Sequence, residues 1–132
     1  IHPRTVKNLK QFDLWEKAGS ISNLQIVEPV GYFDFLKLTS SSMFLLSDSG
    51  GVQEEASVYK KSVVVMRDNT ERPEIIGSFG TLTGYDEKKI VAESKRIIEN
   101  YNKLKEKFVK TPCPFGDGKA SAKIAEILGG TK

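Results

Sequence analysis

Short apolar runs alternate with amphipathic stretches along this chain. Two runs have the composition of buried strands and two shorter runs are weaker candidates, namely Met43–Leu46, Ser62–Met66, Gly80–Thr83 and Leu24–Val27. The stronger runs lack the polar–apolar alternation of a half-buried strand, and segments with helical periodicity separate them. This pattern predicts an α/β fold in which helices cover both faces of a parallel sheet.

Helical segments are predicted in the spaces between these runs. Apolar residues at helical spacing and local capping signals indicate six of them: Thr5–Ala18, Tyr32–Leu38, Gly51–Tyr59, Pro73–Ile76, a long helix from a cap at Asp86 to about Phe108, and a last helix over Ala120–Leu128. Regular alternation of such helices with strands is typical of a three-layer, Rossmann-like domain.

Composition narrows the classes of partner. The 132 residues carry a net charge of +3 from 20 basic and 17 acidic side chains, too small an excess to indicate nucleic-acid binding. The longest apolar runs are much shorter than the ~20 residues that span a membrane. The single Cys113 excludes an internal disulfide framework and fits a reducing compartment, so we expect a cytoplasmic protein. The chain starts at Ile1 without an initiator Met, and we expect residues 1–132 to be one domain of a longer protein.

A glycine turn follows the first strong run. Ser49, Gly50 and Gly51 stand between that predicted strand and the next predicted helix. Backbone N–H groups at such a helix start are well placed to bind a phosphate or diphosphate. The alternative is that a tight strand-to-helix turn simply needs glycine. The turn is not a Walker loop, because no Gly-Lys-Ser/Thr follows it.

Charged side chains cluster near both strand ends. Glu54 and Glu55 lie in the first turn of the predicted helix, where they either complement the helix dipole or reach a ligand, as a carboxylate does with ribose hydroxyls. Arg67 and Arg72 follow the second run and have the planar fork that suits phosphate. Asp68 and Glu71 lie beside them in the sequence, so ion pairs within this loop are the alternative for both arginines.

Four segments together resemble one enzyme family, the non-hydrolysing UDP-N-acetylglucosamine 2-epimerases. The segments are Ser47–Ala56 (SDSGGVQEEA), Val64–Glu74 (VVMRDNTERPE), Gly84–Asp86 (GYD) and Pro114–Ala120 (PFGDGKA). The first two segments are the more specific, and the resemblance extends over nearly the whole chain, from about Ile1 to Leu128. Its departures include Lys60 and Ser62, where a Gly-Lys-Pro turn is common in the family.

The resemblance implies a fold and an activity. The family has the two-domain glycosyltransferase-B architecture, and this chain resembles its C-terminal, UDP-binding half. Members interconvert UDP-N-acetylglucosamine and UDP-N-acetylmannosamine by eliminating and re-adding UDP, without a metal or other cofactor. The catalytic carboxylates and histidine lie in the N-terminal half, so no catalytic residue is expected here. The full-length protein is expected to be a homodimer.

The resemblance also assigns roles to individual residues. It makes Ser49, Gly50 and Gly51 contacts to the diphosphate, Glu55 the acceptor for the ribose hydroxyls, and Arg72 a cation near the nucleotide-sugar.

Three further roles lie nearer the start of the chain. Phe35 matches the aromatic residue beside the uracil, and Val30 stands where many members carry glutamine at the base. His2 matches a His-Pro loop that in some bacterial members touches a second, activating UDP-sugar.

Other functions remain open at this point. The same scaffold serves two-domain glycosyltransferases and hydrolysing epimerases, which also hold a nucleotide in the C-terminal domain. A non-enzymatic nucleotide-sensing module is the alternative from a different class.

Overall fold

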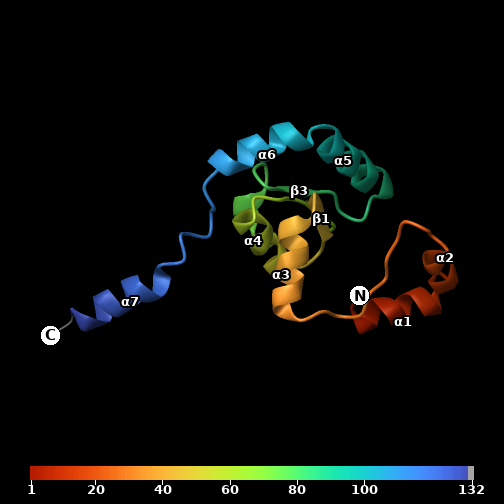
Figure 1. Ribbon diagram of the computed structural model, residues 1–132, viewed down its shortest axis with the longest axis horizontal. Coiled ribbons are helices and arrows are strands. Elements are labelled where there is room, and N and C mark those ends of the chain that lie inside the picture. Colours follow the sequence, from red (N-terminus) through yellow and green to blue (C-terminus); the bar gives the residue numbers. More distant parts are fainter. Residues whose placement is uncertain (131–132) are drawn as a thin grey trace. The chain divides into compact units, whose positions relative to one another are not determined.

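The computed structural model describes residues 1–130 of the chain (Figure 1). Its helices and strands follow in the order α1 Pro3–Gln11, α2 Trp15–Gly19, α3 Tyr32–Ser41, β1 Phe44–Ser47, α4 Gly50–Val58, β2 Ser62–Val65, the 3₁₀ turn η1 Pro73–Ile75, β3 Gly80–Leu82, α5 Glu87–Glu99, α6 Tyr101–Lys110 and α7 Ala120–Gly129. Residue contacts divide the chain into a first unit, Ile1–Lys37, and a second unit that begins at Leu38.

The first unit corrects two predictions. The single helix expected over Thr5–Ala18 is two helices, because the chain turns at Asp13, whose φ is 54°. Asparagine and aspartate tolerate this left-handed conformation better than most residues, so the break falls where the local cost is small. The cap of α1 is His2 and not Thr5.

The strand expected at Leu24–Val27 is also absent. All residues of the first unit are described, and none of them forms a strand with which this run could pair. An isolated extended segment has no ladder hydrogen bonds to stabilise it.

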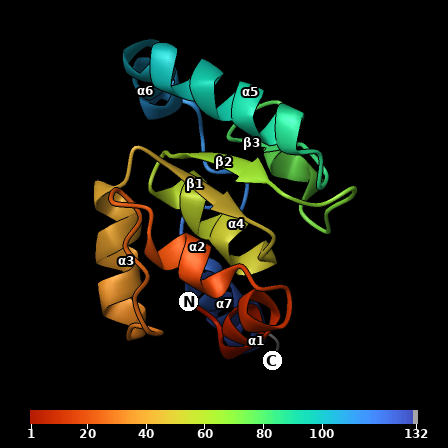
Figure 2. The same cartoon turned by 90° about the vertical axis from the view of Figure 1, so that its right-hand side faces the viewer.

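The second unit contains the parallel sheet, in the strand order β1-β2-β3. Leu45 lies opposite Val63, and Val64 lies opposite Thr81. Figure 2 shows α5 and α6 over one face of the sheet and α4 against the other. The predicted three-layer, Rossmann-like α/β fold is therefore confirmed.

Burial differs sharply between the two apolar strands. All four residues of β2 are buried, as predicted, because this strand has neighbours on both sides. The prediction that Met43–Leu46 is buried is wrong, since β1 lies at the sheet edge and Leu46 is 44% exposed. The core lies around β2 and comprises Ala56, Val63, Val65, Ile75, Phe79 and Phe108.

The long helix predicted after Asp86 is divided at Asn100. Asp86 caps the first part as predicted, with its side chain accepting from Lys89 N at 3.1 Å. Asn100 ends α5 and precedes α6, and its side-chain amide donates to the Arg96 carbonyl at 2.8 Å. Asparagine competes for backbone hydrogen bonds in this way, which weakens a helix interior. No helix among residues 1–130 is both long and apolar enough to span a bilayer.

Candidate functional site

The carboxyl ends of the three strands carry the predicted ligand-binding loops. Met66 N donates to the Ser47 carbonyl at 3.1 Å, and Gly84 N donates to the Arg67 carbonyl at 3.1 Å, so the loops after β1, β2 and β3 are joined by backbone hydrogen bonds. Gly84 has a φ of +61°, and a Cβ on it would come within 2.7 Å of Asp68 Oδ1. Glycine adopts this left-handed conformation without steric cost, and its missing Cβ leaves room for the Asp68 carboxylate.

The bend at Ser49–Gly51 is open at the start of α4. Ser49 is the N-cap residue in an extended conformation, and its side chain makes no capping hydrogen bond. A Cβ on Gly50 would meet no atom within 4 Å. The amides of Gly50, Gly51 and Val52 have no acceptor inside the helix, because helix geometry leaves its first N–H groups without partners. The bend therefore presents oriented donors to an anion.

Arg72 is held at the same helix. Its Nε donates to Glu54 Oε1, and its Nη1 donates to the Glu71 carbonyl at 3.1 Å. The side chains of Arg72 and Glu54 are 36% and 41% exposed, so the guanidinium is partly open to solvent. Arg72 therefore forms an ion pair, but with Glu54 and not with the loop neighbours Asp68 or Glu71 that the sequence offered as the alternative, and this pair keeps the cation beside α4.

Arg67 forms a second ion pair within its own loop. Both of its terminal nitrogens donate to the Glu71 carboxylate at 2.7 Å. This hydrogen bonding lowers the pKa of Glu71 and raises the pKa of Arg67. The Glu71 side chain is 61% exposed and that of Arg67 27%, so solvent screens much of their attraction, and the pair shapes the loop while contributing little to stability.

A buried pair that sequence reasoning missed connects the loop to the helix. Thr70 Oγ1 donates to Gln53 Oε1 at 2.6 Å and accepts from Arg72 N at 3.1 Å. Gln53 is fully buried, and its Nε2 has no hydrogen-bond partner among the described residues. The available signal was that Gln53 shares one helix face with Ala56 and Ser57, which are also buried.

Thr70→Val should lower the free energy of unfolding by about 1–2 kcal/mol, because the Gln53 amide then loses its remaining partner in the core. Urea unfolding followed by circular dichroism measures this change. Thr111→Val is the matched control, since its hydroxyl donates only to the Lys107 carbonyl at an exposed position, and we expect a change within about 0.5 kcal/mol. The double variant Gln53→Leu/Thr70→Val tests the coupling of the two side chains. If its loss of stability equalled the sum of the losses in the two single variants, the pair would not be coupled.

The other predicted site residues have the following environments. Glu55 is half-buried on α4, and within residues 1–130 its carboxylate has no hydrogen bond or ion pair. In the first unit, the Nδ1 of His2 accepts from Arg4 N at 3.1 Å, and Val30 is 41% exposed. Phe35 is half-buried on α3. Residues 1–130 contain no cluster of three or more His, Cys, Asp or Glu side chains able to hold a metal ion.

Fold and site together define a class: a Rossmann-like α/β protein whose helix N-terminus opens at the carboxyl edge of a parallel sheet. Comparison with known protein families identifies the particular family within this class. The profile of the UDP-N-acetylglucosamine 2-epimerase family matches residues 1–129. The chain belongs to this family.

Similar proteins agree with that assignment. UDP-N-acetylglucosamine 2-epimerase from Methanocaldococcus jannaschii is 42% identical over 128 residues, which are 97% of this chain and 33% of that protein. The Campylobacter jejuni enzyme of the same name is 38% identical over 97% of this chain and 32% of its own length. A crystal structure of the M. jannaschii enzyme in complex with UDP-GlcNAc and UDP superposes with a TM-score of 0.75 and 40% identity, covering 98% of this chain and 34% of that one. The chain thus spans about a third of the length of these relatives.

Proposed function

We propose that this chain is the C-terminal, nucleotide-binding part of an enzyme that interconverts UDP-N-acetylglucosamine and UDP-N-acetylmannosamine. The observation that carries the proposal is the open start of α4, with Arg72 tethered to that helix through Glu54. Elimination of UDP places developing negative charge on the diphosphate. Oriented N–H donors and a nearby guanidinium stabilise charge of this kind.

Each residue then has a role in holding the substrate. The Ser49 amide already donates to Ser47 Oγ at 3.1 Å, so the Ser49 hydroxyl and the amides of Gly50 and Gly51 receive the diphosphate, and Arg72 adds a positive charge beside it. The Glu55 carboxylate, which no other described side chain engages, accepts the ribose hydroxyls. Three residues of the first unit complete the assignment: Phe35 and Val30 at the uracil, and His2 at a second UDP-sugar.

Catalysis requires more than residues 1–132. We assign the acid–base groups to an N-terminal half of a glycosyltransferase-B architecture, in a homodimeric cytoplasmic enzyme. This chain alone should therefore bind UDP without epimerising the sugar. Incubation with UDP-N-acetylglucosamine, followed by NMR, should show no N-acetylmannosamine product.

Calorimetric titration with UDP tests the binding assignment. Arg72→Ala should weaken binding at least about tenfold, because a hydrogen bond to a charged group contributes roughly 1.5–3 kcal/mol. Ser49→Asp should abolish binding, because it sets a carboxylate against the diphosphate. Arg96→Ala is the charge-matched control, since Arg96 pairs with Glu93 on α5. This variant should bind UDP with the same affinity as the unchanged chain. No measurable heat, or equal affinity in all four proteins, would contradict the assignment.

A further inference from the structure

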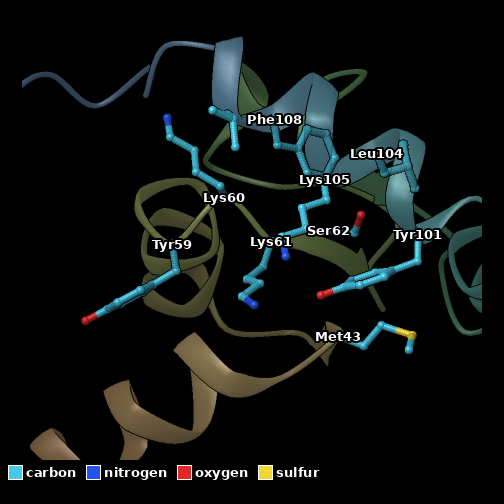
Figure 3. A pocket seen from close by; sticks show the side chains of 10 residues that line it. Met43, Tyr59, Lys60, Lys61, Ser62, Tyr101, Leu104, Lys105 and Phe108 are labelled. Carbon is cyan, nitrogen blue, oxygen red and sulfur yellow. The ribbon is translucent and has the colours of Figure 1, made fainter.

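A second cavity lies at the opposite edge of the sheet from the candidate site. It encloses about 250 Å³ between the end of α4, the starts of β1 and β2, and α6 (Figure 3). Its lining residues are Met43, Tyr59, Lys60, Lys61, Ser62, Tyr101, Leu104, Lys105, Phe108 and Val109. Met43 precedes β1 and Ser62 begins β2, whereas the loops of the candidate site follow the ends of these strands. The two places are therefore separate.

Positive charge in this lining is not balanced by carboxylates. Three lysines line the cavity, and no aspartate or glutamate does. Two of the lysines are occupied, since Lys60 Nζ donates to the Thr111 carbonyl and Lys61 Nζ to the Ser42 carbonyl, each at 2.7 Å. Thr111 directly follows α6 and Ser42 directly follows α3, so these two ammonium groups offset the carbonyl-rich ends of those helices.

Lys105 is the exception. Within residues 1–130 its ammonium has no hydrogen bond and no ion pair. Figure 3 shows its side chain extending from α6 into the space between Lys61 and Tyr101. Lys105 is an exposed residue, but its side chain lines a concave surface, where an unengaged cation attracts an anion more strongly than one on a flat surface in open water. The cavity therefore offers one free positive charge.

The remaining walls are apolar or aromatic. Leu104 and Phe108 come from α6, Met43 lies below them in Figure 3, and the Tyr101 ring lies between Leu104 and Met43. Ligand sites usually combine such walls with a few polar groups that fix orientation. The volume is about that of eight water molecules, which is room for one ring and its substituent. A single free ammonium matches one carboxylate better than a phosphate, which in proteins is commonly held by several N–H donors or arginine.

We propose that this cavity binds a small aromatic monocarboxylate, with the carboxylate on Lys105 and the ring against Leu104 and Phe108. The cavity shares no residue with the nucleotide site. A result against the proposed epimerase function would therefore leave this proposal unchanged, and a result against this proposal would leave that function unchanged.

Titration of the ¹⁵N-labelled chain with benzoate, followed by NMR, tests this proposal. Saturable shifts are expected for amides of Tyr59–Ser62 and Tyr101–Val109, with a Kd of about 1 mM or lower. Lys105→Gln should weaken binding at least about tenfold, and Lys105→Arg, which keeps the charge, should restore most of it. Lys103→Gln is the matched control, because both lysines are exposed on α6 and Lys103 does not line the cavity.

Specific outcomes would overturn the proposal. Benzylamine has the same ring with the opposite charge, and equal shifts with it would show that the ammonium of Lys105 is irrelevant. Inorganic phosphate that displaced benzoate at equal concentration would indicate a general anion site. If Lys105→Gln and Lys103→Gln weakened benzoate binding equally, the effect would come from the overall charge of α6 and not from Lys105 in particular. Absence of saturable shifts in a chain whose spectrum is folded would also reject the site.

Discussion

Phe108→Ala should lower the free energy of unfolding by about 3–5 kcal/mol, the largest effect expected from a single side chain here. Phe108 is 3% exposed, and its ring centroid lies 4.9 Å from that of Phe79. It places α6 against the core cluster that contains Val63 and Ile75. Alanine would leave a cavity at this contact, and the surrounding chain could refill it only in part.

Urea unfolding measured by circular dichroism checks this result. Phe33→Ala is the matched control, because Phe33 is 84% exposed and its truncation should change stability by no more than about 0.5 kcal/mol. Total stability of a domain is commonly about 5–15 kcal/mol, so we expect Phe108→Ala to remove about a fifth of it or more. Similar losses in the two variants would mean that α6 does not depend on this contact.

Gly80→Ala should cost about 2–3 kcal/mol, although it adds only one methyl group. Gly80 is buried in β3, and a Cβ there would come within 2.6 Å of Ile75 Cδ1 and 2.9 Å of Ile75 Cγ1. Ile75 is itself fully buried and has little room to move aside. Gly50→Ala is the control in the same unit, because a Cβ at that position meets nothing within 4 Å.

A double-mutant cycle identifies the cause of the Gly80 effect. Ile75→Val removes Cδ1, the atom nearest to the added methyl group, and by itself should cost about 0.5–1.5 kcal/mol. The double variant Gly80→Ala/Ile75→Val should therefore be more stable than the sum of the single changes predicts. Strict additivity would show that the cost comes from the strand backbone and not from a collision with Ile75.

The elements that local sequence predicted well are those with strong local signals. β2 was recognisable because Val63, Val64 and Val65 form an apolar run that suits a buried parallel strand. The start of α5 was recognisable because Asp86 is a preferred N-cap residue. The helix breaks at Asp13 and Asn100 were missed, since the apolar spacing continues through both positions and a weak local preference becomes visible only in the folded chain.

In the candidate site, too, some features were predictable from the sequence and others were not. The turn at Ser49–Gly51 was predictable as an open helix start after a strand, because two adjacent glycines leave the backbone there uncovered by side chains. The pairing of Arg72 with Glu54, and not with a neighbour in its own loop, was not predictable. The sequence offered several carboxylates at similar distances along the chain, and only the packing of η1 and its loop against α4 selects one of them.

By itself, the sequence determined the α/β class, the family resemblance and the chemistry available at two strand ends, since these depend on residues adjacent in the chain. The tertiary structure decided which strand lies at the edge, which carboxylate holds Arg72, and that Thr70 and Gln53, 17 residues apart, share one hydrogen bond. It also decided that Lys105 extends into a cavity beside Lys61. The physical reason is that side-chain pairing and burial depend on distances in space, which the order of strands and the packing of helices set only once the chain has folded.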